Sequence, residues 1–327
     1  MEIELCAKLS PRKLNIWQDF LKKASLEADL GVEKVALVWD DDTLIATGSR
    51  EGNILKCIAV DEARRGEDLT ATVLSELQKD AFAEGYSHLF LYTKPENCAM
   101  FTSLFFYEVT RTDKVLLMEN RKNGVKDFVA GLPKSDSSGT VGSIVMNANP
   151  FTLGHRFLIE KASAECESVY VFVLSEDKSE FSFKDRFAMV KSGTEDIKNV
   201  TVLPTGPYLI SSATFPTYFL KERDKASEVQ CLLDIEIFSK YYAPYFNITK
   251  RFVGTEPISP MTNMYNKALF ENLPEKGIEV IEIQRAEKES YVISASRVRA
   301  LIKEGKMEEV KKLVPKTTYT HITGGIL

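Results

Sequence analysis

Two short stretches of the sequence carry side chains that suit phosphate chemistry. The first runs from Val141 to His155 and contains Thr152-Leu-Gly-His155 directly after a turn at Asn147–Pro150. The second, Ile293-Ser-Ala-Ser-Arg-Val-Arg299, supplies two hydroxyls, several backbone N–H groups and a guanidinium. Such groups at two helix starts can hold a triphosphate and stabilise the charge on its departing end.

The first stretch predicts a strand, a tight turn and a helix. Val141–Met146 is a short apolar run typical of a buried strand, and the apolar stripe after Gly154 indicates an amphipathic helix. A strand–turn–helix unit points backbone N–H groups and the positive end of the helix dipole toward the turn, where an anion can bind. Asn147 and Gly154 therefore belong to the predicted binding turn.

From residue 141 onward, strand-like runs alternate with helix-like runs. We expect strands at 141–146, 169–174, 200–203, 248–253 and 280–283, and helices at 154–166, 182–193, around 214–222, 227–242, 262–272 and 294–304. This alternation predicts an α/β domain with a parallel sheet and helices on both faces. Ligands of such sheets bind beyond the carboxyl ends of the strands, which is where the Thr152 turn lies.

The first 120 residues follow a different order, which predicts an α+β domain. We expect helices at 10–30, 69–83 and 97–104, and strands at 35–39, 44–47, 54–60, 89–92, 106–109 and 114–118. The polar run Pro133–Gly139 indicates a linker, which we place at 121–140. The expected domains are therefore 1–120 and 141–327.

The overall composition narrows the class of protein. A net charge of −5 argues against non-specific nucleic-acid binding, and no apolar run approaches the roughly 20 residues of a membrane span. The first residues lack the features of a signal peptide. Five widely spaced cysteines without a C-x-x-C pair favour neither a zinc site nor a disulfide framework, so we expect reduced thiols in a cytoplasmic protein with no metal site built from side chains.

The two chemical stretches resemble the paired motifs of the nucleotidylyltransferase superfamily. Thr152–His155 is similar to its T/H-x-G-H motif, and Ile293–Arg299 is similar to its I-S-S-T-x-x-R element. The resemblance implies a Rossmann-like domain that binds ATP, with His155, Thr152 and Arg299 acting on the phosphates. It also implies that Ser294 and Ser296 hold the β and γ phosphates, although both hydroxyls also suit N-capping of the following helix.

Two further matches to the superfamily are weaker. Glu180–Arg186 opens a predicted helix, and in the superfamily an arginine here often reaches the phosphates or the second substrate. A surface ion pair is an equally good interpretation of Arg186. Phe252–Pro257 follows a predicted strand where relatives often recognise adenosine, which implies a role for Gly254 in ATP binding.

The stretch Cys57–Ala71 resembles the coenzyme A-binding loop of the GNAT acetyltransferase fold. In that family a strand leads into a loop of the form R/Q-x-x-G-x-G/A and then a helix, which implies a binding role for Arg65 and Gly66. The two glycine positions hold Asp68 and Thr70 here, and Asp68 places a negative charge where a pyrophosphate would lie. We therefore expect a pantetheine arm held mainly by the strand edge rather than tightly bound free coenzyme A.

A GNAT-like domain joined to a T-x-G-H domain resembles the citrate (pro-3S)-lyase ligase family, and the run Gly142–Glu160 is very similar to that family. The resemblance implies an acid–thiol ligase that uses ATP, Mg²⁺ and acetate. It implies acetylation of the pantetheine-type thiol on the acyl-carrier subunit of citrate lyase, with release of AMP and pyrophosphate. Two alternatives stay open: a cofactor-biosynthetic adenylyltransferase that joins AMP to a phosphorylated acceptor, and a non-catalytic nucleotide-binding regulator.

Overall fold

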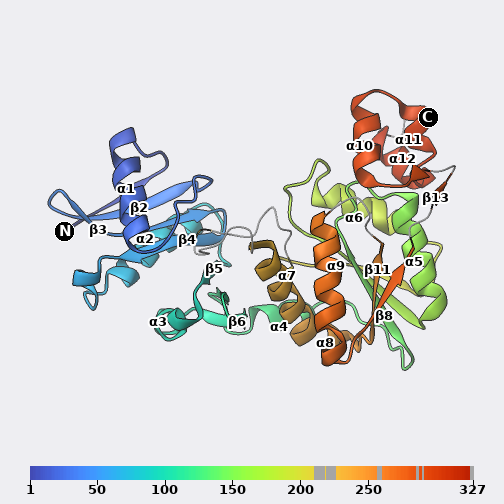
Figure 1. The fold of residues 1–327 in the computed structure, drawn as a ribbon, viewed down its shortest axis with the longest axis horizontal. Helices are drawn as coiled ribbons and strands as arrows, with labels where there is room; N and C mark the ends of the chain where they lie inside the picture. Colours follow the sequence, from blue (N-terminus) through green and yellow to red (C-terminus); the bar gives the residue numbers. More distant parts are fainter. Residues whose placement is uncertain (210–217, 219–225, 256–259, 285–286, 289–290, 325–327) are drawn as a thin grey trace. The chain divides into compact units, whose positions relative to one another are not determined.

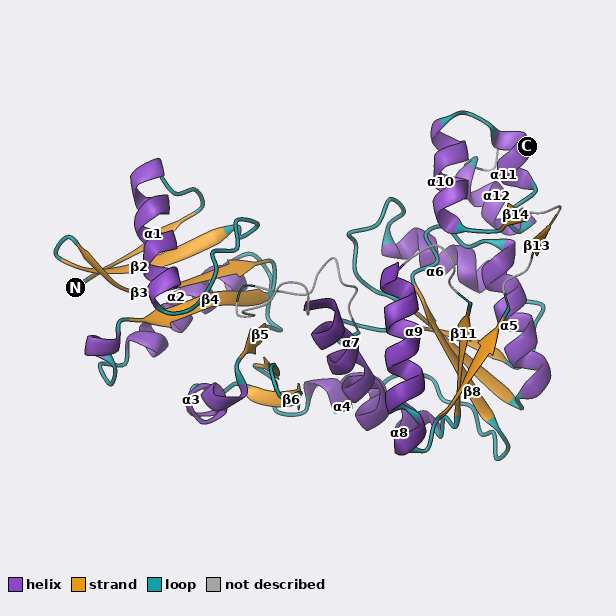
Figure 2. Ribbon diagram, viewed as in Figure 1, coloured by secondary structure: helices purple, strands orange, loops and turns teal. Residues whose placement is uncertain are grey.

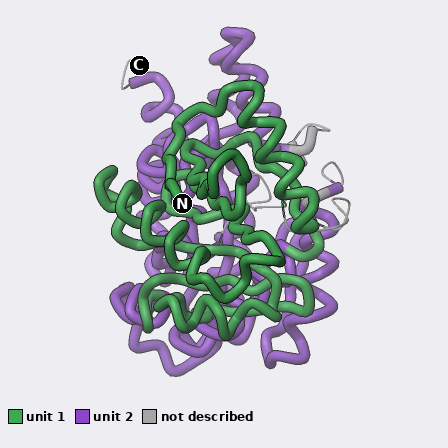
Figure 3. The backbone as a smooth tube through the Cα atoms, turned by 90° about the vertical axis from the view of Figure 1, so that its left-hand side faces the viewer, with its two compact units in different colours: residues 1–124, 215–229 green, residues 125–214, 230–327 purple. Residues whose placement is uncertain are grey.

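The chain forms two compact units (Figures 1 and 3). The computed structural model describes all residues except 210–217, 219–225, 256–259, 285–286, 289–290 and 325–327. Unit 1 comprises Met1–Gly124 with Phe215–Val229, and unit 2 comprises Val125–Thr214 with Gln230–Leu327. A short stretch from the second half of the sequence is therefore part of the first unit, which the predicted linear division into 1–120 and 141–327 does not include.

The predicted linker contains a helix. Helix α4 (Gly124–Ala130) lies inside residues 121–140, and the contacts divide the chain just after Gly124. Val125 and Val129 are buried, which explains why this stretch folds although Pro133–Gly139 after it is polar. The linker prediction thus differs from the structure in its first half.

Unit 1 is built on a seven-stranded sheet with the order β1-β2-β3-β4-β5-β7-β6. Its strands are β1 (Glu2–Cys6), β2 (Lys34–Asp40), β3 (Thr43–Glu51), β4 (Ile54–Val60), β5 (Phe90–Thr93), β6 (Tyr107–Arg111) and β7 (Leu116–Glu119), and its helices are α1 (Pro11–Lys23), α2 (Leu69–Ala83) and α3 (Cys98–Ser103). Neighbours are antiparallel except for β4 and β5. The α+β order was predicted, but strand β1 was missed and the helix expected at 10–30 ends at Lys23.

Local signals explain where these helices lie. The Ser10 hydroxyl accepts a hydrogen bond from the Lys13 backbone N–H, and Pro11 occupies the first turn of α1. Helix α2, predicted at 69–83, buries an apolar stripe of Leu69, Val73, Leu74 and Leu77 against the sheet. Burial of such a stripe supplies most of the stability of a helix of this length.

Strands β4 and β5 separate after a short parallel pairing. Their pairing is limited to Ile54 with Phe90 and Leu55 with Leu91, while β4 continues to Val60 and β5 to Thr93. Beyond these two pairs, the edges of β4 and β5 that face each other are not paired by backbone hydrogen bonds. The separation opens a space inside the sheet of unit 1, described with the sites below.

Unit 2 is built on a five-stranded parallel sheet with the order β10-β9-β8-β11-β12, as predicted from the alternating pattern. The strands are β8 (Val141–Met146), β9 (Ser168–Val173), β10 (Val200–Pro204), β11 (Lys250–Gly254) and β12 (Glu279–Ile283). The main helices are α5 (Leu153–Glu165), α6 (Phe183–Ser192), α7 (Ala226–Ile237), α8 (Ala243–Phe246) and α9 (Pro260–Asn272). The helix expected around 214–222 lies almost entirely outside the described residues.

Helices cover both faces of this sheet, and α5 and α9 lie on opposite sides of it (Figures 1 and 2). On one face Ile159 and Ala162 of α5 pack with Ile144 and Phe252. On the other face the Phe172 ring contacts aromatic rings of the five-residue helical segment Phe238–Tyr242 and of α8. The strands are therefore buried on both sides, which matches their nearly continuous apolar sequences.

Three short helices close the described chain: α10 (Ala295–Lys303), α11 (Met307–Lys311) and α12 (Lys316–Ile322). They share a small core that includes Ile293, Val298 and Val310. The His321 imidazole on α12 lies 3.0 Å from the Asp185 carboxylate on α6. A short two-stranded ribbon, β13 (Glu287–Lys288) with β14 (Tyr291–Val292), precedes α10. Neither this ribbon nor the helices after α10 were predicted.

Among the described residues, no helix combines the length and the apolar character that crossing a membrane requires.

Candidate active site

The first predicted motif forms the N-terminus of α5. Thr152 is the N-cap, and its hydroxyl accepts a hydrogen bond from the His155 backbone N–H at 3.3 Å. In return, the backbone N–H of Thr152 donates to Nδ1 of the His155 ring at 3.0 Å. These reciprocal bonds hold the imidazole against the helix start, beside the backbone N–H groups that favour an anion.

The same contacts define the tautomer of His155. A backbone N–H can only donate, so Nδ1 accepts and the ring proton of neutral His155 lies on Nε2. The ring also stacks on Phe151, with 5.9 Å between centroids and an interplanar angle of 14°. The imidazole is therefore held in the tautomer whose donor N–H is at Nε2.

The second motif lies directly against the first. A Cβ atom on Gly154 would lie 3.1 Å from the carbonyl oxygen of Ile293, so the glycine allows the segment before α10 to approach α5. Ser294 caps α10 by accepting from the Arg297 backbone N–H, and its hydroxyl lies 3.2 Å from that of Ser296. The N-capping interpretation of Ser294 is thus confirmed, and it places both hydroxyls at a second helix start.

Replacing Gly154 with alanine should disturb this contact. The added Cβ forces Ile293 and the segment before Ser294 to shift by a few tenths of an ångström. Such overpacking costs about 1–3 kcal/mol, so we expect a lower thermal midpoint and a several-fold weaker ATP affinity. Calorimetric titration with ATP and a melting curve measure both. Glu160→Ala, on the exposed side of the same helix, is the matched control, and equal ATP affinity in both variants would contradict this packing role.

Arg299 connects the two motifs. Its Nη1 donates to the carbonyl oxygen of Asn149 in the first turn, and its Nε lies 3.7 Å from the Glu180 carboxylate. Lys303, one helical turn further along α10, lies 3.2 Å from the same carboxylate. The Arg299 guanidinium is thus held at the rim of the turn, where it can reach the outer phosphates of a nucleotide.

One cavity of about 420 Å³ lies among these elements. Its lining includes Asn147, Thr152, Gly154, His155, Gly254, Ser294, Ser296 and Arg299. The structure thus brings eight of the nine predicted nucleotide-site residues to one cavity at the carboxyl ends of β8 and β11. Gly254 ends β11, and its carbonyl oxygen accepts from the Asn266 side chain at 2.9 Å.

Arg186 is the exception, and its predicted contact with ATP is not supported by its position. The side chain is fully buried and does not line the cavity. Its guanidinium donates to the carbonyl oxygens of Asn147, Leu174, Glu176 and Phe181, and also to the Asn147 side chain. Arg186 therefore supports the turn that carries Asn147, and its burial rules out the surface ion pair.

Arg186→Lys should accordingly lower stability. A lysine cannot reach all of these acceptors, and each buried acceptor left without a donor costs about 1–3 kcal/mol. We expect a total loss of about 3 kcal/mol and a thermal midpoint lower by about 6–12 °C. A melting curve measures it. An unchanged midpoint together with a large loss of ATP affinity would show that Arg186 contacts the nucleotide instead.

Sequence reasoning missed several residues of the cavity, namely Arg251, Thr262, Tyr265, Asn266 and Gln284. The sequence contains one indication for Arg251, because it is a charged residue inside the apolar run 248–253. Burial of an unpaired charge is costly, so a charged residue in a buried strand points to a specific role. The other four follow strands or lie on α9, and their residue types alone indicate nothing. Their place in the site depends on how α9 packs on the sheet.

The cavity lining contains no aspartate or glutamate among the described residues. Groups of three or more potential ligand side chains, which would bind a metal ion, are also absent from the described part of the chain. Magnesium commonly binds through substrate phosphates with only one or two protein ligands. The site therefore fits an ion that enters with the nucleotide rather than one held by a cluster of acidic side chains.

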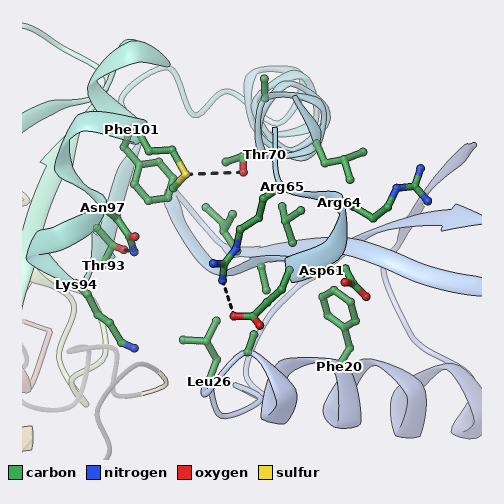
Figure 4. A pocket seen from close by; sticks show the side chains of 18 of the residues that line it. Phe20, Leu26, Asp61, Arg64, Arg65, Thr70, Thr93, Lys94, Asn97 and Phe101 are labelled. Carbon is green, nitrogen blue, oxygen red and sulfur yellow. Dashed lines mark hydrogen bonds and ion pairs between the residues drawn. The ribbon is translucent and has the colours of Figure 1, made fainter. Parts of the chain in front are cut away.

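Unit 1 holds a larger cavity, of about 1020 Å³, where β4 and β5 separate (Figure 4). Thr93, Lys94, Asn97 and Phe101 line one side of it, and Asp61 and Arg65 lie toward β4 and the following loop. Tyr218 also lines it, donating to the Tyr92 carbonyl oxygen at 2.6 Å. The predicted residues Arg65 and Gly66 are thus at a cavity.

The loop that leads into α2 has little free positive charge. Arg64 bonds to Asp40 and Glu67, each at 2.7 Å, and these hydrogen bonds lower the pKa of both carboxyl groups. Arg65 bonds to Glu62 at 3.0 Å. Asp68 has a left-handed backbone with a φ of 55°, the conformation that favours glycine, and its side chain does not cap α2. The conformation and paired charges of this loop therefore agree with the prediction that it does not bind a free pyrophosphate tightly.

Comparison with known proteins identifies the family. A family model described as citrate lyase ligase C-terminal domain matches residues 141–322. Citrate (pro-3S)-lyase ligase of Klebsiella pneumoniae is 40% identical over 309 residues, covering 93% of this chain and 90% of that protein. The protein of the same name from Escherichia coli K12 is 40% identical over 310 residues, with coverages of 93% and 88%.

Among solved structures, Thermotoga maritima TmcAL bound with alpha-thio ATP has a TM-score of 0.33 and 14% identity, covering 57% of this chain and 55% of that chain. The family rests on the sequence relatives, which match nearly the whole chain. The structure contains both predicted parts, an α+β unit and an α/β unit with a parallel sheet. The chain therefore belongs to the citrate (pro-3S)-lyase ligase family.

Proposed function

We propose that unit 2 activates acetate with MgATP. A carboxylate oxygen of acetate forms a bond to the α-phosphorus, the bond to the β-bridging oxygen breaks, and pyrophosphate leaves with that electron pair. The products are acetyl-adenylate and pyrophosphate. The observation that carries this proposal is the meeting of two helix starts, one histidine and one arginine around a single cavity at the strand ends.

Different residues stabilise the negative charge on different phosphates of ATP. His155 donates from Nε2 to the α-phosphate, and the N-terminus of α5 adds its dipole. Ser294 and Ser296 bind the β and γ phosphates at the start of α10, and Arg299 neutralises the departing pyrophosphate. A protein nucleophile is not required, because phosphoryl-type transfers rely mainly on positioning and electrostatic stabilisation.

The second step transfers the acetyl group to a thiol. The thiolate of a pantetheine-type arm on the citrate lyase acyl-carrier subunit attacks the acetyl carbon, and AMP leaves with the bridging oxygen. The cavity of unit 1 suits the uncharged part of such an arm, because the diverging edges of β4 and β5 offer backbone groups. The paired charges of the loop at Arg64 and Arg65 favour it over a free pyrophosphate.

Exchange of labelled pyrophosphate into ATP tests this function against its main rival. The proposed ligase exchanges pyrophosphate only when acetate is present. A cofactor-biosynthetic adenylyltransferase would instead require a phosphorylated acceptor and ignore acetate, and a nucleotide-binding regulator would show no exchange with either. Acetate-independent exchange would therefore contradict the proposal.

A further inference from the structure

A buried arginine, Arg251, lines the cavity of unit 2, and two of its guanidinium nitrogens have no hydrogen-bond acceptor among the described residues. Arg251 is the second residue of β11, is 3% exposed and lines the same cavity as Thr152 and His155. Its Nε and Nη1 atoms are buried and have no hydrogen-bond partner among the described residues. A guanidinium cannot lose its charge in a protein, so this is a buried cation with open donors.

The groups around Arg251 partly stabilise its positive charge but do not accept hydrogen bonds from its Nε and Nη1 atoms. The guanidinium lies 4.6 Å from the centroid of the Phe238 ring, which gives a cation–π contact. Burial lowers the pKa of Arg251, and the nearby Tyr265 and Asp234 act in the opposite direction. The Asp234 carboxylate itself accepts a hydrogen bond from the Gln230 side chain at 2.8 Å.

Arg186 in the same unit shows what a structural buried arginine looks like. It is equally buried, and its guanidinium nitrogens donate to backbone carbonyls or to Asn147. Arg251 has no such set of acceptors, although leaving buried donors of a charged group unpaired is expensive. This difference between two arginines indicates that an anionic ligand completes the surroundings of Arg251.

The position of Arg251 within the cavity selects the kind of anion. Of the groups suited to phosphates, His155, Ser294 and Ser296 lie at the starts of α5 and α10, and Arg299 lies about one turn into α10. Arg251 lies three residues before the end of β11, opposite Ser143 of β8 in the sheet register. The side chains of Tyr265 and Asn266 on α9 line the same cavity. This is a deeper subsite, separate from the residues that suit the triphosphate.

We infer that Arg251 binds the carboxylate of the small acid substrate. The inference rests on the proposed function and names the residue that recognises the acid. One carboxylate oxygen accepts from the guanidinium, which leaves the second oxygen to attack the α-phosphorus. A cation that is buried and already oriented selects a carboxylate over an uncharged amide or alcohol of the same size.

The test uses the full-length chain with Arg251→Met and Arg251→Lys, assayed by pyrophosphate exchange at varied acetate and varied ATP. Hydrogen bonds to charged groups are among the strongest in proteins, so we expect the KM for acetate to rise about 30-fold in Arg251→Met. The KM for ATP should stay within about twofold, and Arg251→Lys should fall between the two. Lys250→Met is the matched control, because Lys250 precedes Arg251 on β11 and lies near Glu165 and Glu279.

A melting curve separates recognition from a structural role. Without a partner for its donors, Arg251 adds little to stability, so Arg251→Met should melt no lower than the wild-type protein. An unchanged KM for acetate, or a KM for ATP that rises as much as that for acetate, would overturn the assignment. If the wild-type protein shows no acetate-dependent exchange, both the proposed function and the assignment of Arg251 are wrong. If the wild-type protein shows this exchange and Arg251→Met has the same KM for acetate, only the assignment of Arg251 is wrong.

Discussion

His155→Ala should lower acetate-dependent pyrophosphate exchange by about 100- to 1000-fold while leaving ATP binding nearly intact. The imidazole is fixed by Thr152 and presents Nε2–H, so its main contribution is to charge that develops on the α-phosphate. Removal of one such preorganised donor typically costs a factor of this size in kcat. The measurement is exchange kinetics together with calorimetric titration of ATP, which separates the chemical step from binding.

His321→Ala is the control for this prediction. His321 is also a histidine of unit 2, but it lies on α12 beside Asp185 and does not line the cavity. We expect its exchange rate to match that of the wild-type protein. Near-normal exchange by His155→Ala would remove the central residue from the proposed chemistry, whereas equal losses in both variants would indicate a general effect on folding.

Thr70→Trp should uncouple the two steps of the reaction. Thr70 lines the cavity of unit 1 in the first turn of α2, 3.9 Å from the sulfur of Met100 (Figure 4). An indole there occupies the space in which we place the pantetheine arm. We expect kcat/KM for acetylation of the acyl carrier to fall at least about tenfold, which is about 1.4 kcal/mol. Exchange of pyrophosphate with acetate should stay within about twofold of the wild-type rate.

The control for Thr70→Trp places the same indole on the opposite side of α2. Lys79 lies nine residues further along the helix, half a turn around its axis, and does not line the cavity. Lys79→Trp should therefore acetylate the carrier normally. Normal acetylation by Thr70→Trp would show that the arm does not enter this cavity, and a parallel loss of exchange would show that unit 1 has a part in the first step.

The fold followed from the sequence wherever one signal determined one element. The apolar run 141–146 became β8 with the same bounds, and the alternation after it became the parallel sheet. The prediction was wrong or incomplete for elements that are determined by contacts with distant parts of the chain. Strand β1 has no strong pattern of its own and pairs along its whole length with β2. The stretch around Tyr218 joins unit 1 through contacts with Glu27 and Tyr92, which are nearly 200 and more than 120 residues away.

The site shows the same limit at the level of single residues. His155 and Ser294 could be predicted because their motifs contain their own local geometry, a cap and a helix start. Arg186 matched a motif position, but whether an arginine faces a ligand or the backbone depends on the carbonyls around it. Arg251 was missed for the converse reason, since its strand suggested only a sheet position and its open donors appear once α9 and Phe238 surround it.

Transfer of oxygen-18 from acetate tests the acetyl-adenylate intermediate most directly. The full-length protein is given acetate labelled at both oxygens, unlabelled ATP and the acyl carrier, and the products are analysed by mass spectrometry. Attack of acetate on the α-phosphorus followed by thiolysis predicts one oxygen-18 atom in each AMP and none in pyrophosphate. Unlabelled AMP, or label in pyrophosphate or inorganic phosphate, would contradict the proposed reaction at the His155 cavity.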